Sequence, residues 1–465
     1  MENIKIAYIG GGSKNWARVF MNDLALSDGL SGEIGLYDID LESAYRNQKI
    51  GQIINSKPET RSKFDYKVYE ELKDALKGAD FVIISILPGT FNEMYSDVHE
   101  PEKYGILQSV GDTVGPGGVL RAMRTVPIYE EFAKKIEKCC PSAWVINLTN
   151  PMSICTKTLY DVFSNIKAFG CCHEVFHAQD FLCLVASDIL GIPRPNRKEI
   201  YTDASGINHF TWIKEAYYKE YDLLALIPEF AKKYYEEGYY EGEDRFAFKT
   251  NTFAYGNKVK MDLFLKYGEL AAAGDRHLVE FVNNKWYLGS KKEVIDWKFQ
   301  LTTVDQRIEK QKEQIEESIA YANGSKEFEL VNSNEEVVDI MKALMGEKIL
   351  VTNVNYPNIG QVKYLPKSSI VETNCVFSSN SIKPIISKDL NPKTAELIAR
   401  NCIHIDLLYD GIKARDLDTI YSAFAMHPLV ENLSKDDCKK LFKSMVRNTR
   451  SYLDNYYELD KFLED

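Results

Sequence analysis

Residues 4–13 read IKIAYIGGGS, an apolar run that ends in three glycines, and apolar residues at helical spacing follow over 15–26. A strand, a glycine turn and a helix in this order are typical of the first unit of a dinucleotide-binding sheet. Glycines allow the tight turn and let a pyrophosphate approach the backbone at the positive end of the helix. Asn15 stands where the usual pattern has a third glycine, so the match is loose. We predict that the turn binds a nucleotide through Gly10, Gly11, Gly12 and Ser13.

Asp38 strengthens the prediction of a nucleotide site. It lies at the end of the second expected strand, 33–39, about where an acid accepts the ribose hydroxyls of NAD. An acid at that place also repels the 2′-phosphate of NADP. Considered alone, Asp38 would only start a surface turn. After a strand, a glycine turn and a helix, it predicts NAD as the cofactor.

Short apolar runs alternate with helical stretches up to about residue 172. Further strands are expected over 80–85, 144–149 and 167–172. Their nearly continuous apolar character indicates burial on both faces, which is typical of a doubly wound parallel sheet covered by helices. We therefore predict an α/β protein whose N-terminal, Rossmann-like domain spans residues 1–196 and binds NAD.

The pattern changes in the second half of the chain. Residues 198–218 alternate like antiparallel strands and 348–376 look extended, whereas 219–238, 291–323 and about the last 75 residues have helical periodicity. No flexible linker separates the two halves. We predict a C-terminal α+β domain over 197–465 that carries substrate, metal and oligomer contacts.

Composition and charge argue against a nucleic-acid or membrane partner. The 465 residues carry 57 basic and 68 acidic side chains, a formal charge of −11, whereas a nucleic-acid partner would require a basic face. No apolar run approaches the roughly 20 residues of a membrane span, so we expect a cytoplasmic protein without a membrane partner. The nine cysteines form no disulfide framework, so free thiols are expected.

Four polar segments occupy places where a packing pattern would be apolar: 111–118 with Arg121 and Arg124 behind it, 147–151, 172–175 and 206–209. Each has an ordinary interpretation, because glycine loops are usually turns, Asn caps helices, and buried Cys or His fills a core. Together they bring a thiol, imidazoles, a carboxylate and amides to the carboxyl ends of neighbouring strands. Open α/β sheets bind ligands there.

One Cys and one His from separate segments are too few for a closed structural zinc site, which takes four protein ligands. They suit an open site that substrate hydroxyls and water complete, where the ion acts as a Lewis acid. Sulfur, nitrogen and sugar-oxygen ligands fit Mn²⁺ or another divalent ion of borderline softness. We therefore predict a divalent metal.

Seven motifs follow one another in the order GGGS, LYDID, GDTVGPGG, NLTNP, CHEV, GINHFTW and NYPNIG, from residue 10 to residue 360. In this order they resemble the family four glycoside hydrolases over nearly the whole chain. That family is the NAD-dependent exception among glycosidases, most of which use two carboxylates. The resemblance implies a lactate- or malate-dehydrogenase-like fold, bound NAD and Mn²⁺, and a homodimer or homotetramer.

The resemblance also implies a reaction: NAD⁺ oxidises sugar C3, a base removes the C2 proton, the C1–O bond eliminates, water adds, and the hydride returns. Cys172 and His209 match the family's metal ligands, and His173 matches the leaving-group acid of some branches. A histidine pKa of about 6.5 suits that task. Asn150 matches a position that contacts substrate hydroxyls, and Asn147 lies close to it in the sequence.

Family members take the C2 base from a Tyr or an Asp downstream of the metal His, which points to residues 267–277. We favour Asp275, which follows Gly274, and keep Tyr267 in reserve. The alternative for Asp275 is that it caps a helix from Arg276 onward.

Cys-His-Glu-Val is similar to the α-galacturonidase branch, so the resemblance implies an α-galacturonide as substrate. An α-glucuronidase, α-galactosidase or α-glucosidase are the alternatives within the family. A uronate requires a cation, and Arg121, Arg124 and Arg276 are candidates. Glu174 would repel the uronate unless it points away or pairs with one of these arginines. A local arginine cluster must also reverse the acidic field of the whole protein.

Two other classes of function stay open. An NAD-dependent hydroxy-acid or sugar-acid dehydrogenase is one, because the first half alone is typical of a dehydrogenase, and it would accumulate NADH. A catalytically inactive NAD-binding protein is the other, although the set of Cys172, His173 and His209 looks complete.

Overall fold

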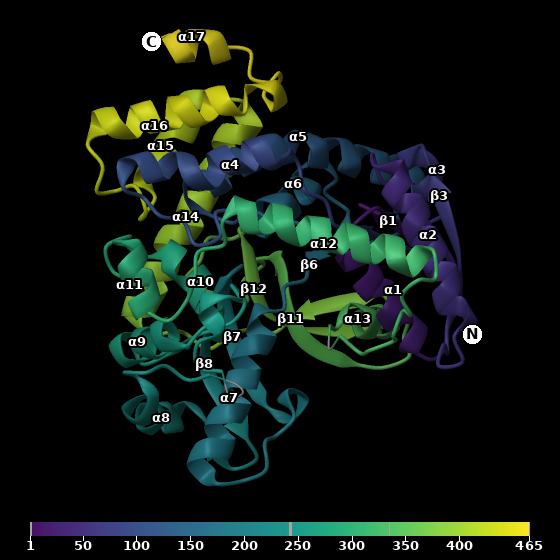
Figure 1. The fold of residues 1–465 in the computed structure, drawn as a ribbon, viewed down its shortest axis with the longest axis horizontal. Helices are drawn as coiled ribbons and strands as arrows, with labels where there is room; N and C mark the ends of the chain where they lie inside the picture. The colour runs from purple at the N-terminus through teal and green to yellow at the C-terminus, as the bar shows by residue number, and fades with distance from the viewer. Residues whose placement is uncertain (1, 241–243, 334, 465) are drawn as a thin grey trace.

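The computed structural model describes residues 2–240, 244–333 and 335–464, and its strands form one continuous mixed sheet (Figure 1). Six neighbouring strands are parallel, in the order β3-β2-β1-β4-β5-β6. This order is that of dinucleotide-binding folds, which confirms the predicted doubly wound sheet. The parallel strands are β1 (Glu2–Ile9), β2 (Leu30–Tyr37), β3 (Lys63–Tyr69), β4 (Phe81–Ile84), β5 (Trp144–Asn147) and β6 (Lys167–Gly170).

Helices cover both faces of the parallel strands. One face packs against α1, α2 and α13, and the other packs against α3, α5 and α6. Because both faces are covered, strands in the middle of the sheet are apolar throughout, and all four residues of β4 are buried. The helices of the N-terminal half, with α13 from later in the chain, are α1 (Trp16–Leu26), α2 (Leu41–Ser56), α3 (Leu72–Leu76), α4 (Phe91–His99), α5 (Gly115–Cys139), α6 (Met152–Val162), α7 (Glu174–Leu190) and α13 (Val337–Leu344).

The sheet continues beyond β6 as antiparallel strands. β11 (Leu350–Pro357) joins β6 through one residue pair, Asn355 opposite Gly170, and the order then runs β11-β12-β7-β8-β10. The extended segments predicted at 198–218 and 348–376 are therefore confirmed. The other strands are β7 (Tyr201–Ile207), β8 (Phe210–Tyr218), β9 (Tyr221–Asp222), β10 (Leu270–Ala271), β12 (Ile370–Ser378) and β13 (Ser381–Pro384).

The predicted helical stretches differ from the structure in two places. Residues 219–238 contain β9 and become helical only at Leu224, where a 3₁₀ turn leads into α8 at Ile227. Residues 291–323 form two helices, because Thr303 starts α12 anew with a capping box in which its side chain and that of Gln306 bond each other's backbone N–H. The helices are α8 (Ile227–Tyr234), α9 (Lys258–Tyr267), α10 (Asp275–Leu278), α11 (Lys291–Asp296), α12 (Val304–Ala322), α14 (Pro392–Ala414), α15 (Leu417–Met426), α16 (Lys435–Asn448) and α17 (Leu459–Glu464).

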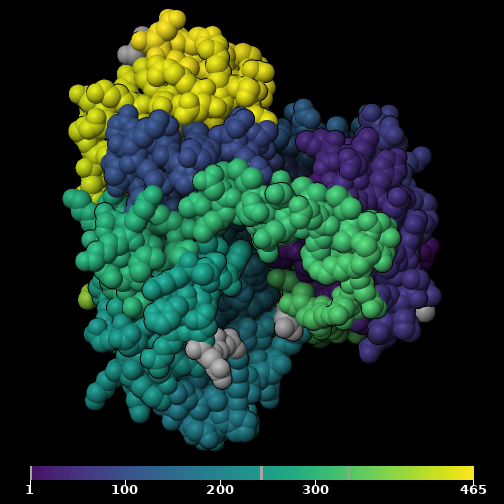
Figure 2. Space-filling model, viewed as in Figure 1, coloured from purple at the N-terminus to yellow at the C-terminus, as the bar shows by residue number. Residues whose placement is uncertain are grey.

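α12 lies across the front of the molecule and packs against α2 and α4 (Figure 1). Beneath it the surface is hollowed, between the teal and purple parts of the chain in Figure 2. α14, α15 and α16 pack against α4 or α5, and α17 lies beyond α16. Within the described ranges, the helices include none whose length and apolar character would suit a membrane span.

Candidate active site

The turn after β1 is built for glycine. Gly10 has a φ of +96°, and a Cβ atom on it would lie 1.9 Å from the carbonyl oxygen of Ser85. A Cβ atom on Gly11 would lie 2.8 Å from the Cα atom of Leu36. Larger residues would therefore push β1 away from its neighbours, and the bare glycine backbone is of the kind that a pyrophosphate can approach closely.

Asp38 faces this turn from the end of β2. Its Oδ2 atom accepts the Gly12 N–H at 2.8 Å, and its Oδ1 atom accepts the Asp40 N–H at 2.9 Å. A Cβ atom on Gly12 would lie 2.9 Å from Oδ2, so the contact requires glycine. Ile39 beside it is 94% exposed. The turn, a partly exposed carboxylate and an apolar neighbour fit an adenosine ribose and its pyrophosphate.

Cys172 and His209 come together at the carboxyl edge of the sheet. Cys172 follows β6, and the side chain of Asn208, which precedes His209, hydrogen-bonds its thiol. His209 lies in the turn between β7 and β8, with a φ of +62°. Its Nδ1 atom is 2.9 Å from Thr113 Oγ1, so Nε2 is the nitrogen left for a ligand.

Glu174 connects the imidazoles of the cluster. Its Oε2 atom accepts the Gly274 N–H at 2.6 Å, while Oε1 lies 3.6 Å from His277 Nε2 and 4.0 Å from His173 Nε2. Burial alone would raise the pKa of Glu174, but the nearby imidazoles hold it well below its usual range. Among the described residues Glu174 therefore neither points away from the cluster nor pairs with Arg121, Arg124 or Arg276, as the prediction required, but is turned toward imidazoles.

His173 sits at the N-terminus of α7 between two rings. Trp16 stacks on it at 5.7 Å, and His177 lies at 4.9 Å, both between ring centroids. Its Nδ1 atom is 3.3 Å from an oxygen of Glu335. Burial lowers the pKa of His173, yet Glu335 and Glu174 raise it overall above 6.5. His173 is thus held in one place, and the carboxylates beside it favour the protonated ring, which suits a group that donates a proton.

The donor set of the cluster suits a divalent ion. Burial and the carboxyls of Glu372 and Glu174 raise the pKa of the Cys172 thiol well above its usual value. A nearby cation is therefore needed before the thiolate can form. The Oδ1 atoms of Asn150 and Asn208 are buried and have no hydrogen-bond partner in the described part of the chain. Sulfur, imidazole and free oxygen acceptors match a borderline divalent metal with open positions.

Arg124 does not face this cluster. It forms a buried, bidentate ion pair with Asp97, with N···O distances of 3.1 Å and 2.5 Å, and is 3% exposed. This corrects the prediction that Arg124 is available to a substrate, because both of its Nη atoms are committed to a carboxylate and its unpartnered Nε atom is buried beside Gly89.

Arg121 and Arg276 have looser surroundings. Arg121 Nη1 lies 4.0 Å from an oxygen of Asp112, and its buried Nε atom has no partner among the residues that the structure describes. Arg276 donates to Thr302 Oγ1 at 3.0 Å and covers the ring of Phe253 at 4.3 Å. Both guanidinium groups keep donors free for an anion.

The two predicted asparagines differ. Asn147 is fully buried, its Oδ1 atom accepts from Tyr129 at 2.6 Å and from the Thr149 N–H at 3.0 Å, and its Nδ2 atom donates to Thr149. Its amide thus stabilises the turn that carries Asn150 and has no group left for a substrate. Asn150 is partly exposed and keeps its Oδ1 acceptor free.

Asp275 is the first residue of α10, and its carboxylate accepts the backbone N–H groups of Val259 and Lys260 at 3.2 Å and 3.0 Å. It therefore caps the start of α9. The alternative, that Asp275 caps its own helix from Arg276 onward, is wrong. Burial raises the pKa of Asp275 to about 6, against the opposing charge of Lys260. A carboxyl with that pKa can exchange a proton near neutral pH.

Tyr267 ends α9, and its ring packs against Trp212 at 5.5 Å between centroids. Burial raises its pKa, and the charged groups that act on it are Glu396 and Asp262. The structure does not bring Tyr267 to the imidazole cluster.

Comparisons with known families agree with this geometry. The model of the family 4 glycosyl hydrolases matches residues 5–187, and the model of the C-terminal domain of the same family matches residues 204–430. The chain is a family 4 glycosyl hydrolase. The ordered motifs thus identified the family correctly, and the protein is an enzyme that hydrolyses glycosidic bonds.

Relatives of this glycosyl hydrolase align along its whole length. An α-galacturonidase of Thermoanaerobacterium saccharolyticum is 49% identical over 98% of each chain. The crystal structure of a putative glucosidase of Bacillus subtilis is 45% identical, covers 96% of this chain and 100% of its own, and superposes with a TM-score of 0.90. A 6-phospho-α-glucosidase from gut microorganisms, crystallised with NAD and Mn²⁺, is 19% identical over 97% and 99% of the chains, with a TM-score of 0.79. At that identity it supports the fold alone.

Several side chains of this glycosyl hydrolase that reach the cluster were not selected from the sequence. Thr113 lies inside the GDTVGPGG motif and His277 lies in the stretch searched for a base, so both could have been found as motif members. No sequence motif marks the others. They are Glu335 beside His173, Glu372 beside Cys172, and Arg307 on α12.

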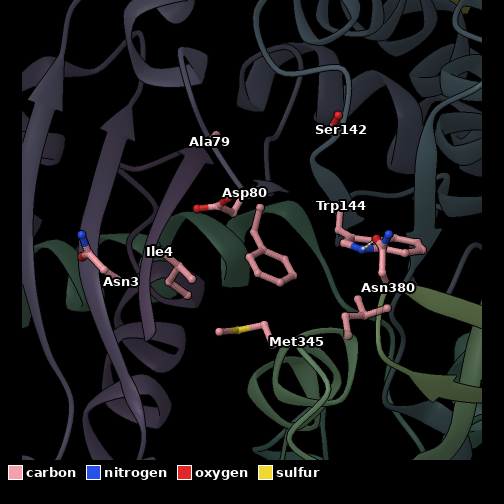
Figure 3. Close-up of a pocket in the computed structure, with 10 residues that line it drawn as sticks. Asn3, Ile4, Ala79, Asp80, Ser142, Trp144, Met345 and Asn380 are labelled. Atoms are coloured by element: carbon pink, nitrogen blue, oxygen red, sulfur yellow. Dashed lines mark hydrogen bonds between the residues drawn. The ribbon is translucent and has the colours of Figure 1, made fainter. Parts of the chain in front are cut away.

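A surface pocket of about 480 Å³ lies elsewhere in the glycosyl hydrolase (Figure 3). Ile4, Phe81 and Trp144 line it, and they begin or lie near the beginning of β1, β4 and β5. It therefore opens at the amino edge of the parallel strands, opposite the edge that carries Gly10 and Cys172. It is not the candidate active site.

Proposed function

We propose that this glycosyl hydrolase cleaves α-galacturonides. One observation carries the proposal: the donor pair Cys172 and His209 shares the carboxyl edge of the sheet with two arginines, Arg121 and Arg276, whose donors are not used up by carboxylates. An open metal site binds sugar hydroxyls, and an arginine binds a uronate. The identity of 49% with a whole-length α-galacturonidase supports the same substrate.

NAD and a divalent metal, Mn²⁺ or another ion, complete the site in this proposal. Gly10, Gly11, Gly12 and Ser13 would hold the pyrophosphate, Asp38 would hold the ribose, and Cys172 with His209 would hold the metal. Bound there, NAD would supply hydride transfer with the sugar and the metal would supply Lewis-acid polarisation of sugar oxygens.

The chain's own groups move the protons. His173, which Glu335 and Trp16 hold in place, donates a proton to the leaving oxygen at C1. Asp275, with its pKa raised to about 6, removes the proton at C2. We prefer it to Tyr267, whose ring faces Trp212. Asn150 offers its free Oδ1 atom to a sugar hydroxyl, while Asn147 positions the turn that carries it.

The division of labour along the chain belongs to the same proposal. Residues 1–196 bind NAD, and residues 197–465 supply substrate, metal and oligomer contacts. We further propose a cytoplasmic homodimer or homotetramer, which light scattering coupled to size-exclusion chromatography would test against a monomer of 53.2 kDa.

The decisive experiment uses the reduced enzyme with NAD⁺, Mn²⁺ and p-nitrophenyl α-galacturonide. Release of nitrophenol, with deuterium from D₂O at C2 of the released sugar, is the expected result. Cleavage of the α-glucuronide or α-galactoside without cleavage of the α-galacturonide would overturn the substrate. Net accumulation of NADH would instead indicate a dehydrogenase.

A further inference from the structure

Arg307 projects from the first turn of α12, the helix that crosses above the hollow in Figure 2. It is partly buried, and one of its Nη atoms donates to the backbone carbonyl of Val110 at 2.6 Å. Its Nε atom is buried and has no hydrogen-bond partner within the described residues. Since a buried guanidinium N–H without an acceptor is costly, this atom is suited to an acceptor that comes from outside the chain.

Arg307 does not act alone. Its guanidinium group lies close enough to Arg121 and Arg276 for their charges to interact, and we call these three residues the arginine cluster. Arg121 and Arg307 lie beside Asp112. The Nε atom of Arg121 is likewise buried and without a partner in the described part of the chain. Two unused donors thus belong to neighbouring guanidinium groups that come from two different helices, α5 and α12.

The cluster carries more positive than negative charge. Burial would raise the pKa of Asp112, yet Arg121 and Arg307 hold it below its usual range, so this carboxylate is charged. A second nearby acid is Glu280, whose Oε1 atom accepts the backbone N–H groups of Val110 and Gly111 and whose pKa burial raises to about 7. Three guanidinium groups thus share this region with the carboxyl groups of Asp112 and Glu280, while Asp97, which also interacts with Arg121, is paired with Arg124. In a protein with a net charge of −11, this local surplus is the reverse of the overall balance.

We propose that Arg307, together with Arg121 and Arg276, binds the C6 carboxylate of a hexuronide and so sets the preference of the enzyme for uronic acids over neutral sugars. The inference rests on the proposed function, since it assigns the acidic group of that substrate to a place in the site. It replaces Arg124, which Asp97 occupies, with a residue that is 183 positions further along the chain. A planar guanidinium suits the bidentate geometry of a carboxylate.

The test compares two substrates that differ only at C6: p-nitrophenyl α-galacturonide and its methyl ester, which is neutral. Arg307→Gln is expected to lower kcat/KM for the acid by about 10- to 100-fold, the range for a lost hydrogen bond to a charged group, mainly through KM. The ester is expected to keep its kcat/KM, and Arg307→Lys to recover part of the loss for the acid. Lys310 is an exposed cation on the same helix, and Lys310→Gln is the matched control. It should leave kcat/KM unchanged for both substrates.

Equal losses for acid and ester, or no loss for the acid, would overturn the proposal. A second measurement separates this result from folding and from turnover: calorimetric binding of galacturonate and of galactose to the holoenzyme. Arg307→Gln should weaken the binding of galacturonate by about tenfold or more and leave the binding of galactose unchanged. Unchanged galacturonate binding would also overturn the proposal. If the parent enzyme binds galacturonate through Arg307 but does not cleave the galacturonide, the proposed function fails while this inference stands.

Discussion

At the scale of single residues, the proposed metal site depends on Cys172. The change Cys172→Ser replaces a soft thiolate with a hydroxyl that does not ionise at neutral pH. We expect Mn²⁺ to bind at least about 100-fold more weakly. This loss of affinity is larger than the loss caused by removing a residue that only supports a metal ligand. Calorimetry with Mn²⁺ and NAD⁺ would measure the change. Cys171→Ser, in the neighbouring residue, is the control, and equal weakening in both variants would contradict the assignment.

Arg124 has a structural role that can be separated from substrate binding. Arg124→Met leaves the buried carboxylate of Asp97 without its partner, which is expected to cost about 3–5 kcal/mol of unfolding free energy. Urea unfolding measures the loss. Arg61→Met breaks an exposed pair with Asp28, and we expect it to change the free energy by less than about 1 kcal/mol. Similar values for both variants would show that the buried pair is not stabilising.

The sequence could name Cys172, His173 and His209 because each lies in a short motif after a strand. It could not show that Arg124 is occupied, because its partner Asp97 lies on another helix and only packing brings the two together. Arg307 was hidden for a related reason. It looks like one more charge on a polar helix until α12 is placed over the site.

At the scale of elements, the turn between β1 and α1 can be tested through Gly12. Gly12→Ala would place a methyl group 2.9 Å from the carboxylate of Asp38 and disturb the bond that couples the two. We expect NAD⁺ affinity to fall at least about tenfold, equal to about 1.4 kcal/mol, with the protein still folded. Fluorescence titration with NADH measures the change.

Gly289→Ala is the matched control for the glycine turn. Its new methyl group would meet only the end of the Glu293 side chain at 2.4 Å, and that side chain can move away. Unchanged NAD⁺ affinity in Gly289→Ala and in Gly12→Ala alike would show that the turn does not depend on glycine at this position.

Elements with strong periodicity were predictable, and the exceptions have physical causes. Five parallel strands were found, but β3 was not, because it lies at the edge of the sheet and alternates exposed charges such as Lys63 and Asp65 with buried rings. The break before α12 was missed as well, since the capping box of Thr303 is a local signal inside a long helical pattern.

At the scale of the whole molecule, Glu280 makes stability depend on pH. Its pKa is raised from 4.5 to about 7 by burial, so the folded protein keeps a proton that the unfolded chain has released between those values. The contribution of Glu280 to the free energy of unfolding is fully present below about pH 4.5. It is lost as the pH rises through about 7, and the loss is up to about 3 kcal/mol.

Glu280→Gln tests this dependence, because an amide oxygen can keep both hydrogen bonds that Oε1 accepts. We compare the free energy of unfolding of the variant minus that of the parent. This difference is expected to be larger at pH 8 than at pH 5, by up to about 3 kcal/mol. Urea unfolding at both pH values supplies the comparison. A variant-minus-parent difference that does not change with pH would contradict it.

The single residue pair that joins β6 to β11 ties the two halves into one hydrogen-bonded surface. The strand that completes the edge of the parallel sheet comes from residues 350–357, far beyond any boundary near 196. A fragment that ends at 196 would leave β6 with an open edge, which favours aggregation. Transfer of the parallel sheet to another enzyme would therefore have to include β11, so the N-terminal and C-terminal halves are expected to be inherited as a unit.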